Sequence, residues 1–154
     1  MQDLPSLEDA FTKAIPPEHE LANRITFQPH DFFQPQTVVA DVYFLKAVLH
    51  DWPDEEARAI LRALVPALRP GARIVLCEGL APAFDTEAWD TMPWVARQML
   101  SALDLHMLVQ FNAKQRTMED WTSLFAGADS RLRLARTFTL PGGSWAVLEV
   151  VFCG

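Results

Sequence analysis

The chain has 154 residues, of which 50% are hydrophobic, and it carries a formal net charge of −7 at pH 7. This size and composition predict one domain over residues 1–154 with a substantial core, and they exclude a disordered chain. The acidic balance argues against a nucleic-acid partner, because phosphate contacts need a basic surface and the 13 Lys and Arg residues do not cluster. Neither a signal peptide nor an apolar run of the ~20 residues that cross a membrane is visible, so we expect a cytoplasmic protein without membrane contact.

The amino-terminal part predicts short elements of an α/β domain. Residues 1–5 resemble the exit of a strand, a short helix follows at 7–14, and the alternating run at 25–28 predicts a short strand. His30 and Asp31 then have two interpretations, a polar turn or a strand-end loop that faces a binding crevice. We favour the second, because loops of this kind recur at the ends of the predicted strands.

The stretch 41–79 organises the rest of the chain. An apolar, β-prone run leads into the polar loop 46–52, and the helix after this loop has an apolar stripe that begins at Ala57. Pro66 should bend the last turn of this helix, because proline removes an internal hydrogen bond. The apolar run 73–77 reads as a strand buried on both faces, which completes a right-handed βαβ unit with parallel strands.

Two polar groups follow the ends of these two strands. His50 lies in the loop after the first strand, and Glu78 closes the second. Because the carboxyl ends of neighbouring parallel strands lie at one edge of the sheet, we expect both side chains in one crevice. A histidine beside a carboxylate that orients it is an arrangement typical of a general base.

The second half predicts helices and a hairpin. A helical region at 86–110 is divided by Pro93, and its face rich in Met and Trp suits either a core or a small-molecule pocket. Thr117 caps the next helix. An edge strand at 132–138 and a returning strand at 145–152 predict an antiparallel hairpin. Its turn is placed at Gly142 and Gly143.

The remaining chemistry of the chain predicts no metal and no disulfide. The two cysteines, Cys77 and Cys153, fall in or beside predicted strands, so we expect buried reduced thiols. The four histidines are too dispersed for a zinc site.

From Asp3 to its end, the sequence resembles the carboxyl-terminal part of an S-adenosylmethionine-dependent O-methyltransferase of the plant and fungal type, the caffeic acid O-methyltransferase-like family. The motifs that carry the resemblance are FLKAVLHDWPDEEA and LRPGARIVLCEG. It implies an α/β fold, an incomplete Rossmann-like class I methyltransferase sheet that is mostly parallel with a C-terminal antiparallel hairpin. It also implies methyl transfer from S-adenosyl-L-methionine to a hydroxyl of a phenolic or related secondary metabolite.

The resemblance also implies roles for individual residues. His50 corresponds to the general base and Glu78 to its acidic partner. The positions that contact the cofactor are matched by Asp3, Asp31, Phe32, Lys46 and Trp52. The helix that lines the acceptor pocket is matched by Asp104 and Met107.

Two departures from the family pattern bear on activity. Gln115 stands where the family has a second catalytic acid, and an amide cannot stabilise a cation by charge. None of the six glycines forms the G-x-G cradle that holds the methionine end of the cofactor, and the amino-terminal dimerisation domain lies outside the matched part. We therefore expect a truncated catalytic domain.

The departures leave two alternatives to an active methyltransferase. The first is a catalytically inactive remnant or accessory subunit of a biosynthetic pathway, and the second is a cofactor-independent rearrangement that uses the acid–base pair. Without the family's central strand, the neighbouring strands would also expose unpaired edges, so we expect an oligomer or a complementing partner chain.

Overall fold

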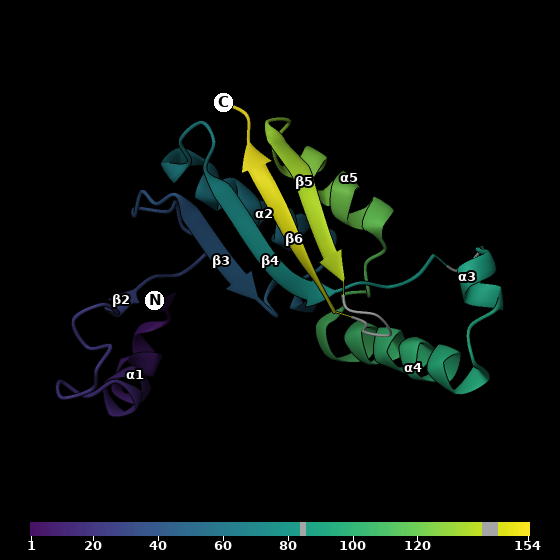
Figure 1. The fold of residues 1–154 in the computed structure, drawn as a ribbon, viewed down its shortest axis with the longest axis horizontal. Coiled ribbons are helices and arrows are strands. Elements are labelled where there is room, and N and C mark those ends of the chain that lie inside the picture. Colours follow the sequence, from purple (N-terminus) through teal and green to yellow (C-terminus); the bar gives the residue numbers. More distant parts are fainter. Residues whose placement is uncertain (84–85, 140–144) are drawn as a thin grey trace.

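The computed structural model describes residues 1–83, 86–139 and 145–154. Its centre is a four-stranded sheet with α2 (Asp54–Leu64) and α5 (Met118–Ala128) packed together behind it (Figure 1). The strand order is β3 (Val42–Lys46), β4 (Arg73–Gly79), β6 (Trp145–Phe152) and β5 (Leu132–Thr139).

The strand directions confirm the predicted α/β class and the C-terminal hairpin. β3 and β4 are parallel, whereas β6 is antiparallel to both β4 and β5. The sheet is therefore mixed, with its parallel part confined to the βαβ unit. The predicted turn at Gly142 and Gly143 lies outside the described residues.

The βαβ unit forms as its hydrophobic pattern predicts. The stripe of α2 is buried through Ala57, Ile60 and Leu64, and three acidic residues occupy the first turn, where the helix dipole favours negative charge. At Val65 the chain enters a 3-10 turn, Val65–Ala67, so Pro66 ends the regular helix. The apolar face of α2 packs on the sheet and joins the main core.

The prediction that the strand at 73–77 is buried on both faces is wrong. Ile74 and Leu76 are fully buried, but Val75 and Cys77 on the opposite face are only half-buried. An ion pair between Arg73 and Glu149, 3.1 Å apart, marks that second face as partly solvated. The expectation of two buried thiols is wrong as well, because Cys77 is half-buried and Cys153 is exposed beyond the end of β6.

A small lobe, drawn in purple in Figure 1, lies beside β3. Its strands β1 (Gln2–Asp3) and β2 (Gln28–Pro29) pair in parallel, and a 3-10 turn leads into α1 (Glu8–Ala14) between them. The predicted strand at 25–28 is therefore displaced toward Pro29. Among the described residues, β3 has no strand partner on its outer edge.

The third region is an arm of two helices, α3 (Glu87–Asp90) and α4 (Trp94–Phe111), separated at Pro93 as predicted. α4 ends at Asn112, whose φ of 52° is left-handed. The next helix, α5, begins with the expected capping box between Thr117 and Asp120. Within the described ranges, no helix is both long and apolar enough to cross a membrane.

Candidate active site

The site begins with a sharp turn at the end of β3. Ala47 has a φ of 53°, a left-handed conformation that residues with a Cβ rarely adopt. Its amide donates to the carbonyl of Cys77 at 3.0 Å, which closes the pairing with β4. The turn takes the chain off the sheet edge and into the 3-10 turn Leu49–Asp51, which carries His50.

Glu78, at the end of β4, is fully buried and holds this loop. Its Oε1 accepts hydrogen bonds from the amides of Val48 at 3.1 Å and Leu49 at 2.8 Å. Its Oε2 lies 2.9 Å from Nδ1 of His50. Because an isolated buried carboxylate is costly, the two amide donors and the nearby imidazole explain how the charge is accommodated.

His50 lies between two carboxylates. Its Nδ1 faces Glu78, and its Nε2 lies 3.1 Å from Oδ1 of Asp51. The ring is edge-on to Trp145, with 5.7 Å between the centroids, and the side chain is 18% exposed. The hydrogen bond with Glu78 raises the pKa of His50 above its ordinary value, whereas burial of the ring opposes the rise. An imidazole in this setting accepts a proton more readily than one in water.

Arg116 is a site residue that the sequence analysis did not identify. Its side chain is fully buried, and it donates to the carbonyls of Leu49 and Trp52, each at 2.7 Å. It also pairs with Asp54 at 2.9 Å. An arginine in a polar loop gives no periodic signal of burial. The contact between Asp51 and His50 was likewise missed, although adjacency in the sequence was a clue to it.

The side chain of Gln115 lies against Gly79, the residue that follows Glu78. Its Oε1 is 2.7 Å from the point where a Cβ on Gly79 would lie, so any side chain at 79 would displace it. The backbone amide of Gln115 donates to Oδ1 of Asp104 at 2.7 Å. The carboxylate of Asp104 therefore anchors this loop to α4, and Met107, one turn further along α4, is buried.

Four of the five residues predicted to bind the cofactor line two cavities that share Phe32 and Val48. Asp3, Phe32 and Lys46 line the first, a cavity of ≈510 Å³ between the small lobe and β3. Phe32 and Trp52 line the second, of ≈620 Å³, together with Asp51. Both volumes are in the range of small-molecule sites. The imidazole of His50 lines neither cavity, but its neighbour Asp51 connects it to the second.

The fifth residue, Asp31, behaves as the polar-turn interpretation predicts. Its Oδ1 accepts a hydrogen bond from the amide of Phe33 at 2.9 Å. His30, in contrast, lines the ≈510 Å³ cavity. The binding role of this loop stays a prediction.

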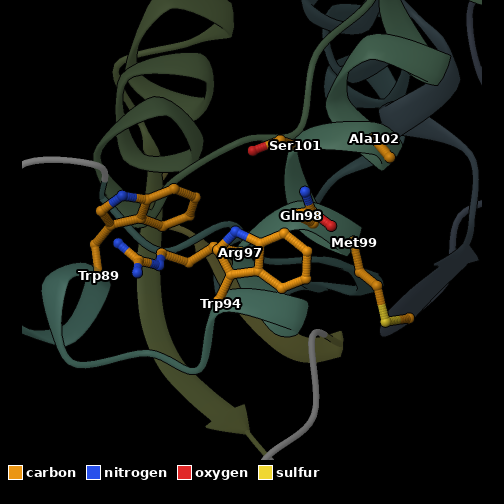
Figure 2. A pocket seen from close by; sticks show the side chains of 7 residues that line it. All are labelled: Trp89, Trp94, Arg97, Gln98, Met99, Ser101 and Ala102. Atoms are coloured by element: carbon orange, nitrogen blue, oxygen red, sulfur yellow. The ribbon is translucent and has the colours of Figure 1, made fainter.

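A third cavity, of ≈740 Å³, lies on the arm and includes none of the predicted site residues. Figure 2 shows the side chain of Arg97 between the rings of Trp89 and Trp94, with Met99 further along α4. Trp89 and Met99 from the face rich in Met and Trp therefore line this pocket, whereas Met107 from the same face is buried. Within the described part of the chain, no three His, Cys, Asp or Glu side chains are grouped to hold a metal ion.

The sequence and fold are similar to those of known O-methyltransferases. The O-methyltransferase pyvH of Aspergillus violaceofuscus is 41% identical over 157 residues, covering 100% of this chain and 35% of that protein. The O-methyltransferase NcsB1 from neocarzinostatin biosynthesis, solved with S-adenosylmethionine and 2-hydroxy-5-methyl naphthoic acid, has a TM-score of 0.76 at 26% identity, covering 98% of this chain and 40% of that chain. A structure described as a pericyclic reaction enzyme has a TM-score of 0.79 at 28% identity, with coverages of 99% and 35%.

The chain spans about a third of the length of the curated relatives it matches. The O-methyltransferase domain family matches residues 1–130, which include β3, β4 and the loop that carries His50. With a match over most of its length, this chain belongs to the O-methyltransferase domain family.

Proposed function

We propose that residues 1–154 are part of a catalytic domain that transfers a methyl group from S-adenosyl-L-methionine to a hydroxyl of a phenolic or related secondary metabolite. His50 is the general base. The observation that carries this proposal is the 2.9 Å approach of the His50 Nδ1 to the buried Glu78 carboxylate. That contact leaves Nε2 as the nitrogen available for proton transfer.

The proposed reaction needs a base and an aligned acceptor. When bound, S-adenosyl-L-methionine supplies a methyl group on a positively charged sulfur. The acceptor hydroxyl takes the place of Asp51 beside Nε2 of His50 and gives up its proton there. Glu78 holds the imidazole in one orientation and stabilises the imidazolium. General-base catalysis of this kind contributes roughly 10²–10⁴-fold.

Positioning should contribute more than the base. Alignment of two bound reactants lowers a barrier by roughly 7–11 kcal/mol. α4 contacts the 3-10 turn that carries His50, which supports Asp104 and Met107 as residues on the acceptor side. Gln115 replaces an acid in this proposal, so it contributes by hydrogen bonding and not by charge.

The residues that line the two joined cavities fit the nucleoside part of the cofactor. Asp3 supplies a carboxylate for hydroxyl groups, and Phe32 and Trp52 supply aromatic surface. The two rings are 5.9 Å apart and edge-to-face, so they form one apolar wall. Lys46 lines the first cavity, and Asp31, in the turn next to Phe32, completes the proposed set.

The binding of S-adenosyl-L-methionine to the full chain, measured by calorimetric titration, tests the proposal. We expect micromolar affinity, weakened in Asp3→Asn and unchanged in the matched control Asp9→Asn on α1. The variant His50→Gln should keep this affinity while methyl transfer to a hydroxylated aromatic acceptor falls by roughly 10²–10⁴-fold. Heat indistinguishable from dilution with the wild-type chain would contradict the proposal.

A second candidate function is a role without methyl transfer, as an accessory subunit or in a rearrangement that needs only acid–base help. The similarity to a pericyclic reaction enzyme favours it. The neutral Gln115, which lies against Gly79 next to Glu78 in the sequence, is consistent with it as well. Absence of cofactor binding together with an intact titration of His50 is the result expected for this candidate.

The outer edge of β3 supports the proposal of a second copy or a complementing chain. Among the described residues β3 has no strand partner on this edge, and unpaired strand edges recruit further strands. Light scattering should therefore show self-association or aggregation of the isolated chain. A monomer with one sharp thermal transition would contradict this part.

A further inference from the structure

Among the described residues, Arg116 is the most buried charged side chain after Glu78, and its hydrogen bonds are directed at the loop that carries His50. Its Nη1 donates to the carbonyl of Leu49 and its Nη2 to that of Trp52, each at 2.7 Å. These two carbonyls bracket His50 and Asp51 in the sequence. The guanidinium therefore spans the segment that carries the proposed base.

The same segment is held from its other side by Glu78. The carboxylate accepts from the amides of Val48 and Leu49, and the guanidinium donates to the carbonyls of Leu49 and Trp52. Leu49 is thus fixed through both its N–H and its C=O. The planar guanidinium of arginine presents several N–H donors in a fixed geometry and can bond two carbonyls at once. The ammonium of lysine, on a flexible stem, is less suited to this.

Arg116 is itself held rigidly. Its Nε and Nη2 donate to Oδ1 of Asp54 at 3.0 Å and 2.9 Å. Its guanidinium lies 5.1 Å from the ring centroid of the buried Trp121. The first turn of α2 and the core of α5 therefore set the position of the group that braces the loop.

We propose that Arg116 is a positioning residue for His50, holding the 3-10 turn Leu49–Asp51 so that the imidazole stays against Glu78. The inference rests on the proposed role of His50 as base. Three observations support the proposal: the guanidinium of Arg116 is buried, it bonds the carbonyls on either side of His50 and Asp51, and Leu49 is bonded by both Arg116 and Glu78.

The charges around His50 provide a second measurement, the pKa of His50, which would not change if the role of Arg116 were purely structural. Glu78 on β4 and Asp51 on the turn raise the pKa of His50, whereas Arg116 lowers it. Trp145 on β6 faces the ring without a charge. Removal of the guanidinium should therefore shift the titration of His50 toward higher pH.

The experiment uses the full chain without ligands and compares Arg116→Met and Arg116→Lys with the wild type. The titration of His50 and the hydrogen exchange of the Leu49 amide are followed by NMR. In Arg116→Met we expect a higher midpoint for His50. We also expect exchange at Leu49 at least ten-fold faster than in the wild type, with β4 amides such as Leu76 less affected.

Arg116→Lys keeps the charge but not the fork. We expect faster exchange at the Leu49 amide and a smaller shift of the His50 midpoint than in Arg116→Met. If Arg116→Met does not fold, the exchange rate of Leu49 in Arg116→Lys alone tests the proposal. The matched control Arg131→Met removes a half-exposed arginine that pairs with Asp129. It should change neither readout.

An unchanged His50 titration and Leu49 exchange in Arg116→Met would overturn the proposal, as would an equal acceleration of all amides. Where the wild-type chain transfers methyl groups, kcat should also fall about 10²-fold in Arg116→Met, as expected for a small misplacement of the base, while KM for S-adenosyl-L-methionine changes little. If the wild-type chain transfers none, the proposed function fails, and the NMR readouts still decide the role of Arg116.

Discussion

The loop that carries His50 and the arm that carries α4 differ in how their side chains are covered. In the loop, Glu78 and Arg116 are buried and bonded to backbone groups of the same few residues. On the 18-residue α4, by contrast, Met107 is the one residue of this described helix that is buried, and Met99 and Val109 are 69% and 71% exposed. The partners that hold the loop all belong to this chain. In contrast, α4 presents an apolar surface of the kind that usually binds another surface.

This contrast separates two kinds of stability. Contacts in the loop should respond to substitution as a buried network does, with large and local effects. Substitutions along α4 should change the stability of the isolated chain only slightly. Their effect should be larger when another surface covers the helix. Substitutions in the buried loop should therefore change stability more than substitutions along α4.

Removal of the buried carboxylate should have the largest effect. Glu78→Ala leaves two backbone amides and His50 without their acceptor, so we expect the free energy of unfolding to fall by about 3–5 kcal/mol. Urea unfolding followed by circular dichroism measures this change. The control Glu20→Ala, at an exposed loop position, should stay within ~0.5 kcal/mol of the wild type. Equal losses in the two variants would contradict the assignment of Glu78 as the centre of the network.

A pair of leucines compares the two regions directly. Leu61 on α2 is fully buried, and Leu105 on α4 is 60% exposed. Leu61→Ala should cost about 2–5 kcal/mol of unfolding free energy, because it leaves a cavity in the core. Leu105→Ala should cost less than ~0.5 kcal/mol in the isolated chain. A large loss at Leu105 that depends on protein concentration would show that another surface covers α4.

The stability of the loop should depend on pH through His50. Its pKa is raised in the folded chain, chiefly by the hydrogen bond with Glu78, so the folded state binds the proton more tightly. This contribution is fully present below the unfolded value of about 6.5 and is lost as the pH rises through the folded pKa. Unfolding free energy should therefore fall as the pH rises above about 6.5. The variant His50→Gln should flatten that slope, and an unaltered slope would assign it to other groups.

The smallest effect is expected at Gln115, whose side chain lies against Gly79. Gln115→Glu adds a negative charge near the site, which should raise the pKa of His50 further. At this partly exposed position, the new carboxylate should stabilise the protonated His50 by ~1 kcal/mol. The rate of methyl transfer should therefore rise by less than about ten-fold. Gln110→Glu, on the exposed end of α4, is a control that should leave the rate unchanged. A loss of rate in Gln115→Glu would indicate that the amide has its own function.

Several features of the fold and the site could be predicted from sequence because their causes are local or periodic. The apolar stripe of α2 and the capping box at Thr117 depend on neighbours within a few residues. The meeting of His50 and Glu78 follows from one rule, that neighbouring parallel strands end at the same edge of a sheet. The displacement of β2 to Pro29 and the exposure of Cys153 were missed, since both depend on where pairing stops.

The βαβ unit, the family and the two residues at the strand ends could be inferred without a structure, because each is encoded in a short, continuous pattern. The burial of Arg116 against Leu49 and Trp52, and the left-handed turn at Ala47 that brings the loop onto Glu78, become visible only in the folded chain. The two Arg116 contacts join residues 67 and 64 positions apart. Whether a charge is solvated or buried at such a contact depends on what packs around it, and no local pattern records that.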